Sequence, residues 1–325
     1  MKKRIFSAVL AILLVLSACG QKSTGGLSGA VGQTDASTEE VASTAVTEQE
    51  TEVIETEQVM EPSISTRKDQ HAASIIVAMA FLPEEKPEST LKQADVDCET
   101  FQWLTSTYAV YCYHTGRDFH LIGGYSDETQ EGYDSLAVGL EQSWGITDRA
   151  SALDDIAWLI AGGHSQGYNE EIQTMADAGI LYCDDVEFEA FFLELQELNG
   201  WTDEERTDTK YYYRKLRDIY EESGKNGIDA WDYSRAMQLC GQCYHLGYLT
   251  LEEALEIQLA IGQAIQAEYS SWDDWNRSYV NGYEYWTYGN GSAASRRWSY
   301  QKLTYEEDNP FAILDFNMPL EKFWE

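Results

Sequence analysis

The chain has 325 residues, and its 56 acidic against 22 basic side chains give a formal net charge of −34. This charge argues against nucleic acid as a partner and against a chain that lies flat on an anionic membrane surface, because phosphates repel carboxylates. A cationic partner is compatible with the charge, although a strongly charged, solvated surface is its commoner meaning.

The first segment, residues 1–19, has the pattern of a bacterial lipoprotein signal. Residues 2–4 are all basic, and the apolar run at residues 5–16 is too short to span a bilayer. The Leu-Ser-Ala-Cys sequence that ends at Cys19 resembles the lipobox, in which the cysteine carries the acyl chains. We therefore expect an extracytoplasmic protein that Cys19 anchors to the cell membrane. The alternative is a plain cleaved signal with a coincidental cysteine.

Residues 20–70 are predicted to form a disordered tether. The segment is rich in Ser, Thr, Gly, Glu and Gln and contains no aromatic residue, so it lacks the apolar surface that a packed core requires. Its acidic side chains repel one another and favour an extended chain. We expect this segment to lift the following domain off the lipid.

Residues 71–325 are predicted to form an all-α domain, which is long enough for one core or for two lobes. Apolar residues recur at helical spacing, and the few prolines fall between the helical segments. One short extended candidate, residues 119–122, is isolated. The predicted helices cover residues 71–81, 97–114, 131–143, 148–161, 169–178, 186–198 and 203–223, and three more helices follow between residues 231 and 286.

The first of these three helices carries a stripe that we expect to be buried. At 100° per residue, Asp232 falls on the same face as Ala236, Leu239 and Cys243. A carboxylate on such a face needs a partner, and Arg235 is the nearest candidate. Two interpretations stay open: Asp232 stabilises the start of a helix, or it is a paired carboxylate in a functional cleft.

The next two helices have clear start signals. Thr250 and Glu253 form a capping box, and Ser271 precedes Asp274 at the same spacing. The last helix then carries an aromatic stripe, which more often packs in a core than binds a ligand. Gly282 within it indicates close approach of a neighbouring backbone. The stripe consists of Trp272, Trp275, Tyr279, Tyr283 and Trp286.

These residues resemble an uncharacterised bacterial family, domain of unknown function 1266 (DUF1266), which includes the YbeU- and YbeR-like proteins. The resemblance covers most of the chain after its first hundred residues and supports the expected fold, but it implies no reaction or ligand. It rests on Trp231-Asp232-x-x-Arg235, Gly247-Tyr248, Glu253-Ala254, Ser271-Trp272, Tyr279 with Gly282 and Trp286, and upstream on Ser143-Trp144-Gly145-Ile146 and Gly163-His164.

Residues 163–167, Gly-His-Ser-Gln-Gly, match the G-x-S-x-G motif of serine hydrolases. That motif works on a strand-to-helix turn, whereas residues 152–161 have helical spacing. We therefore interpret the glycines as a helix C-cap and loop. The order Ser165, Asp229 or Asp232, and then His245 suits a hydrolase, but no alternating β/α pattern surrounds it.

Cys240 and Cys243 form a C-x-x-C motif in mid-helix, where the N-terminal dipole that activates redox cysteines is missing. His245 points away from Cys243 on the wheel, so we expect neither a metal site nor any other cofactor. Among the five cysteines after Cys19, one disulfide and free buried thiols both remain open. These five are Cys98, Cys112, Cys183, Cys240 and Cys243.

The leading functional hypothesis is a binding or scaffolding module with a protein or cell-envelope partner. Ten Trp and 21 Tyr residues also suit a surface that stacks sugars, and residues 286–291 are a candidate exposed aromatic loop. The alternative is a hydrolase-like enzyme, with His164, Asp232 and Arg235 lining a cleft between two helical halves. The candidate binding residues are Trp144, Tyr248, Trp272, Tyr279 and Trp286.

Overall fold

The computed structural model describes residues 68–324, except 84, 89–90, 92–95, 97, 225–226, 289–291 and 293. The predicted anchor at Cys19 and residues 20–67 of the predicted tether lie outside this range. Helix α2 begins at Lys68, so the helical domain starts three residues before the predicted boundary. Part of the proposed aromatic loop, residues 289–291, also lies outside the described residues.

The described chain is all-α, as predicted, and no strand occurs in its described ranges. None of the helices described is long and apolar enough to cross a membrane. The elements are α2 (Lys68–Ala80), α3 (Glu99–Ser106), α4 (Ala109–Thr115), the 3₁₀ turn η2 (Ile122–Gly124), α5 (Gln130–Trp144), α6 (Arg149–Ala161), α7 (Gly163–Asp177), α8 (Asp185–Asn199), α9 (Asp203–Ser223), α10 (Asp229–His245), α11 (Leu251–Glu268), α12 (Trp272–Trp286), α13 (Ser295–Leu303) and α14 (Pro310–Ile313).

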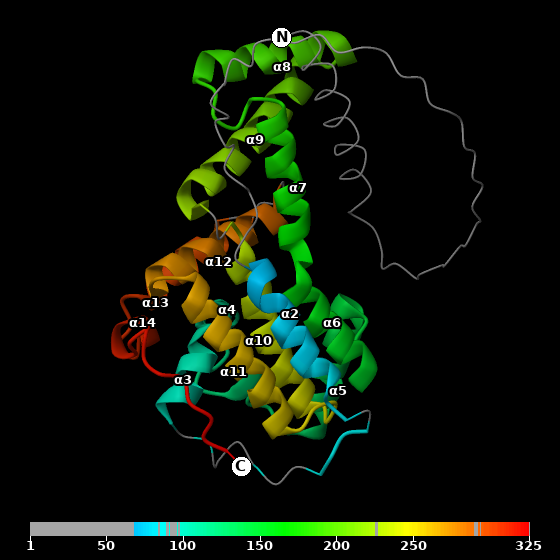
Figure 1. The fold of residues 1–325 in the computed structure, drawn as a ribbon, viewed down its shortest axis with the longest axis vertical. Coiled ribbons are helices and arrows are strands. Elements are labelled where there is room, and N and C mark those ends of the chain that lie inside the picture. Colours follow the sequence, from blue (N-terminus) through cyan, green and yellow to red (C-terminus); the bar gives the residue numbers. More distant parts are fainter. Residues whose placement is uncertain are drawn as a thin grey trace, which may run out of the picture.

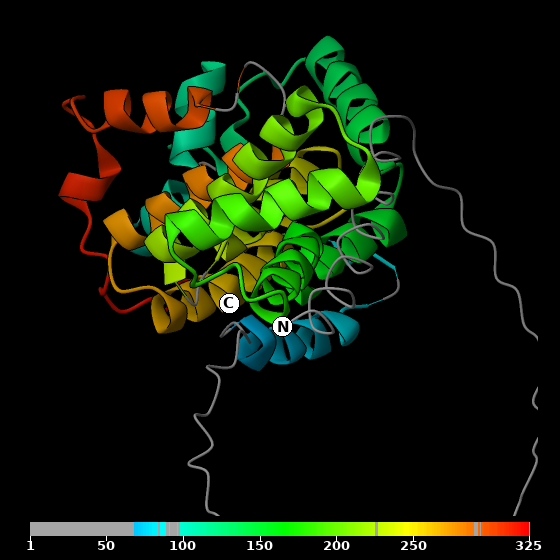
Figure 2. The same ribbon diagram turned by 90° about the horizontal axis from the view of Figure 1, so that it is seen from above.

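The helices pack around two apolar cores. The larger core gathers side chains of α2–α6 and α10–α12, and the smaller one belongs to α7, α8 and α9. Figure 1 shows α8 and α9 at one end of the molecule, α10 and α11 in the body, and α7 running between the two parts. Seen from above, the green helices α7–α9 lie over the yellow and orange helices of the body (Figure 2). Helix α7 therefore runs between the two cores, and α9 also packs against α12 of the body.

Helix α10 lies at the centre of the body, where it packs against α6, α11, α12 and η2. The predicted stripe is buried along its length, from Asp232 to Cys243. A side chain at Gly282 of α12 would collide with Trp231 of α10, which confirms the close approach expected there. The backbone of α12 consequently lies against the Trp231 side chain of α10, and the aromatic residues of the two helices come together.

Both predicted helix starts are confirmed. The Thr250 backbone N–H donates to the Glu253 carboxylate over 2.9 Å, and the Glu253 N–H donates to the Thr250 hydroxyl over 3.1 Å. The Asp274 N–H donates to the Ser271 hydroxyl over 3.1 Å. Glu253 also receives Arg149 in a two-pronged ion pair, with N–O distances of 2.6 and 2.9 Å. This pair joins the first turns of α6 and α11.

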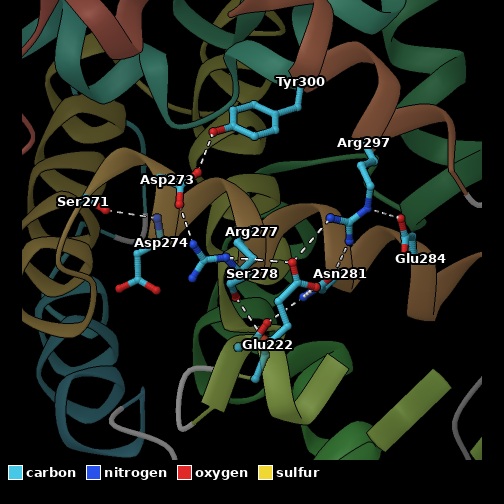
Figure 3. Close-up of polar contacts among 12 residues, drawn as sticks. Glu222, Ser271, Asp273, Asp274, Arg277, Ser278, Asn281, Glu284, Arg297 and Tyr300 are labelled. Carbon is cyan, nitrogen blue, oxygen red and sulfur yellow. Dashed lines mark hydrogen bonds and ion pairs between the residues drawn. The ribbon is translucent and has the colours of Figure 1, made fainter. Parts of the chain in front are cut away.

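Polar contacts hold the outer face of α12 between the end of α9 and α13 (Figure 3). Glu222 of α9 accepts a hydrogen bond from Asn281 over 3.0 Å and lies 3.6 Å from the guanidinium of Arg297. Arg297 of α13 in turn donates to Glu284 over 2.8 Å. Because these contacts fix the polar face of α12, the aromatic face is held towards α10.

Two of the predicted local structures are wrong. The helix predicted at 97–114 is broken between α3 and α4, where Tyr108 leaves the helical region (φ −119°) and its hydroxyl accepts the Gly123 N–H over 3.0 Å. Residues 119–122 form no strand; Ile122 instead begins η2. In both places a contact between Tyr108 and the η2 turn overrides the local preference.

Helices α13 and α14 follow the three predicted ones and were not expected. Helix α7 begins at Gly163 and not at residue 169, so the predicted helix C-cap and loop at residues 163–167 is also wrong. The segment is the first turn of a helix. This turn forms because the carboxylate of Asp232 accepts its backbone N–H groups.

Candidate ligand-binding site

The carboxylate of Asp232 caps the first turn of α7 from a distant part of the chain. One carboxylate oxygen accepts the His164 backbone N–H over 3.1 Å and lies 2.8 Å from His164 Nδ1. The other accepts the Ser165 N–H over 2.9 Å and the Ser165 hydroxyl over 2.8 Å. Helix N-termini present unpaired N–H groups and a partial positive charge, so Asp232 satisfies them as an ordinary N-cap residue would.

Gly163 makes this contact possible. Its φ is +50°, and a Cβ built on it would lie 2.6 Å from the Asp232 carboxyl carbon. Any other residue would thus be strained and would displace the carboxylate. Asp232 is fully buried, and its position accounts for the Gly-His-Ser-Gln-Gly sequence as a helix start built around a buried acid.

His164 lies at the edge of a separate cavity of about 650 Å³, which we call the histidine cavity. Its imidazole packs edge-on against Trp158, with 5.1 Å between ring centroids. Ser165 is 2% exposed and donates its hydroxyl proton to Asp232, so it does not present a nucleophile. The serine-hydrolase interpretation of residues 163–167 therefore has neither the strand nor the exposed serine that it requires. The other walls of this cavity include Glu171, Tyr212, Tyr285 and Trp286.

Arg235 is placed elsewhere, in a second cavity of about 320 Å³ that we call the arginine cavity. Its guanidinium carbon lies 4.2 Å from the ring centroid of Trp144, 4.7 Å from Trp231 and 5.3 Å from Trp286. These indoles come from α5, α10 and α12, and their π-faces attract the cation. Burial lowers the pKa of Arg235 to about 10, against the opposing charge of Asp232, so the side chain is still a cation at neutral pH.

The three candidate catalytic residues do not converge on one site. Asp232 and His164 are in contact, whereas Arg235 carries no ion pair to Asp232 in the described chain and lines the other cavity. The three residues thus share no single cleft, because the histidine cavity, whose walls come from α6, α7, α9 and α12, contains only His164 among them. Trp286 lines both cavities and is 51% exposed.

Three of the five candidate binding residues line the arginine cavity, namely Trp144, Tyr279 and Trp286. Trp272 instead packs in the core against Trp103, with 4.9 Å between ring centroids, and donates its indole N–H to the Leu314 carbonyl over 2.9 Å. Tyr248 is half-buried beside the Arg149–Glu253 pair, where its backbone carbonyl accepts from Arg149 over 3.0 Å. The stripe on α12 is therefore core at one end and cavity wall at the other.

Two further arginines that the sequence pattern does not predict, Arg117 and Arg296, also line this cavity. Nitrogen atoms with no hydrogen-bond partner are buried at all three arginines and also at Trp231 and Gln238, which line the same cavity. An unpartnered buried donor costs about 1–3 kcal/mol, and more when it is charged. The cavity therefore gathers unsatisfied donors. In the sequence, the one signal for this cavity is the spacing of Trp231 and Arg235. Residues four apart lie on the same face of a helix, so these two side chains are expected to be neighbours.

The cysteines contribute no site. All five after Cys19 are free thiols, and Cys240 and Cys243 are fully buried. Burial raises the pKa of Cys112 and of Cys243 to about 12, so these thiols are protonated at neutral pH and unreactive. Within the described ranges, no group of three or more His, Cys, Asp or Glu side chains could hold a metal ion.

Comparison with known proteins places the chain among relatives of unknown activity. A family model described as "Protein of unknown function (DUF1266)" matches residues 139–316, more than half of the chain. Uncharacterized protein YbeR of Escherichia coli (strain K12) is 29% identical over 147 residues, which is 45% of this chain and 56% of that protein. The match thus spans about half the length of this relative. No solved structure matches.

Proposed function

We propose that this chain, which belongs to the DUF1266 family, is a ligand-binding module held at the outside of the cell membrane by a lipid on Cys19. The arginine cavity is its binding site. The observation that carries the proposal is the convergence of three tryptophans from separate helices on Arg235, whose guanidinium has an unpartnered nitrogen. Apolar walls with a few unsatisfied polar groups are what small-molecule sites have in common.

Binding accounts for these residues better than hydrolysis does. Asp232 is sealed from solvent and occupied with the start of α7, while His164 and Arg235 line different cavities. A general base must reach the group from which it takes a proton, and His164 does not share the cavity in which Arg235 would hold a ligand. The resemblance confirmed as DUF1266 membership is compatible with this role, although it names no ligand.

The membrane attachment rests on sequence. The basic start, the short apolar run and the lipobox-like Leu-Ser-Ala-Cys19 together support acylation. The acidic residues 20–67 support an extended spacer between the lipid and the helical domain. The partner that we expect is therefore cell-envelope material that reaches the domain on the outer side of the membrane.

The binding site is tested by thermal unfolding of the full chain against a panel of small sugars, sugar acids, dipeptides and organic acids. A ligand at 100 times its dissociation constant adds about 2.7 kcal/mol of stability, which raises Tm by about 5–10 °C in a domain of this size. We expect at least one compound to do so in the wild type and in Trp298→Ala, which changes an exposed tryptophan outside the cavity. The same compound should lose its effect in Trp286→Ala. A shift that survives in Trp286→Ala would contradict the site.

The anchor is tested separately by the intact mass of protein extracted from membranes. We expect a diacyl or triacyl adduct that disappears in Cys19→Ala. An unmodified mass, with the protein released to the medium, would contradict lipid anchoring and leave the proposed binding site untouched.

A further inference from the structure

The arginines of the described chain divide into those that pair with an acidic side chain and those that do not. Of the nine arginines in the described part of the sequence, six pair with an aspartate or glutamate. The six are Arg149, Arg206, Arg214, Arg217, Arg277 and Arg297. The remaining three, Arg117, Arg235 and Arg296, form no ion pair with any described residue, and all three line the arginine cavity. In a chain with 56 acidic side chains, the described arginines without an ion pair are thus collected in one cavity.

Aromatic rings lie close to these guanidinium groups. The guanidinium of Arg296 lies 4.8 Å from the ring centroid of Tyr283 and 5.1 Å from that of Tyr111. Arg117 lies 5.6 Å from Tyr125, and Arg235 is held among three indoles as described above. An aromatic ring does not replace the oxygen acceptors of a guanidinium, so the N–H groups at its edges still need acceptors in the plane.

Several nitrogen atoms at those edges have no hydrogen-bond partner in the described chain. The unpartnered buried atoms are Nη1 of Arg117, Nη1 of Arg235, and both Nε and Nη1 of Arg296, a side chain that is only 7% exposed. The neighbouring orphans, Trp231 Nε1 and Gln238 Nε2, are donors as well. The cavity therefore gathers several unpartnered donors, and the Tyr279 hydroxyl in the same wall has no partner among the described residues either.

Charge points the same way. No aspartate or glutamate is among the residues that line the arginine cavity, although three cations meet there. After burial, the nearby charge of Asp232 raises the pKa of Arg235, and the charge of Arg296 has a smaller effect that lowers it. Water could accept some of the N–H bonds, but it would not offset three like charges in a partly buried space. A negatively charged ligand that is rich in acceptors would accept the N–H bonds and also offset the positive charges.

We propose that the arginine cavity binds a small anion, a carboxylate or phosphate group carried on a single ring. The anionic group lies against the guanidinium edges, which suit the geometry of both oxyanions, and the ring packs on the indoles of Trp231 and Trp286. The cavity of about 320 Å³ is at the small end of ligand sites, so it fits one ring and not a polymer. The inference rests on the proposed binding function and names its ligand class.

The test is calorimetric titration of the full chain with matched pairs of charged and neutral probes. The pairs are benzoate with benzamide, and glucuronate with glucose; inorganic phosphate is titrated alone. We expect at least one anion to bind about tenfold or more tightly than its neutral partner. Preference for glucuronate identifies a sugar acid as the source of the anionic group, and preference for benzoate identifies an aromatic acid. Binding of inorganic phosphate alone identifies a phosphate ester. Each of these three results supports the anion site.

Substitutions locate the binding. Arg235→Gln and Arg296→Gln should each weaken the preferred anion about tenfold or more, whereas Arg277→Gln, which removes a paired arginine from the outer face of α12, should leave its affinity unchanged. Because Arg235 forms no ion pair in the described chain, Arg235→Gln should fold, with a somewhat lower Tm because its contacts with three indoles are lost. It therefore gives a result even where the more deeply buried Arg296→Gln does not fold.

The outcomes separate this inference from the function on which it rests. Equal affinity for the charged and neutral members of a pair, lost in Trp286→Ala, would overturn the anion site and leave the binding module standing. Anion affinity that Arg235→Gln does not change would also overturn the inference. The binding module itself would fall if no probe bound and the thermal panel were silent as well.

Discussion

Replacing Asp232 by asparagine removes the charge that holds the start of α7. The carboxylate accepts from two backbone N–H groups, one hydroxyl and one imidazole nitrogen. Asparagine keeps a single acceptor oxygen, so its amide nitrogen must face a group that also donates. Hydrogen bonds to charged groups contribute about 1.5–3 kcal/mol each, and an unsatisfied buried donor costs a further 1–3 kcal/mol or so.

Losing two of the four contacts therefore lowers the free energy of unfolding by about 3–6 kcal/mol, and the unsatisfied donor adds to this loss. For a domain of this size, that corresponds to a fall of about 10 °C in Tm. Urea unfolding followed by far-ultraviolet circular dichroism measures the difference. Asp154→Asn is the control, because Asp154 is exposed on α6 and should change the stability by less than about 0.5 kcal/mol. A loss below about 1 kcal/mol for Asp232→Asn would refute the capping role.

Glu253→Gln should lower the free energy of unfolding by about 3–5 kcal/mol, because it leaves Arg149 without its buried partner. Glu256→Gln breaks an exposed pair on the same helix and should lower it by less than about 1 kcal/mol in the same urea assay. Alkylation with iodoacetamide at pH 8, read by mass, should leave Cys243 unmodified in the folded protein, since burial raises its pKa to about 12; modification at the rate of a free thiol would contradict that burial. Burial lowers the pKa of His245 below its ordinary 6.5, so the folded state favours the neutral ring. The free energy of unfolding should therefore fall as the pH drops below 6.5, and it should fall more in the wild type than in His245→Gln.

The fold could be predicted largely because its signals are local. The capping box of Thr250 and Glu253 and the apolar stripe of α10 each lie within a few turns of one helix, so periodicity and spacing were enough to find them. The start of α7 could not be found in this way. Its cap is Asp232, which is 67 residues from Ser165, and nothing near residue 163 shows that a carboxylate will arrive there.

The site was predictable only in part for the same reason. Trp144, Tyr279 and Trp286 were selected as candidate binding residues, and the fold brings them to one cavity. Arg117 and Arg296 were missed because a sequence shows each arginine without its partners. Their significance is that they form no ion pair with any described residue, which depends on how α4, α10, α12 and α13 pack together.

The most direct test follows the arginine Nε–H signals by nuclear magnetic resonance as the preferred anion is added. Arg296 and Arg297 are neighbours in sequence, but Arg296 Nε has no partner, whereas Arg297 Nε donates to Glu284 over 2.8 Å. We predict that the Arg296 signal moves on saturation while the Arg297 signal stays in place. An unmoved Arg296 signal at saturating ligand, with shifts confined to the paired surface arginines, would contradict an anion site in this cavity.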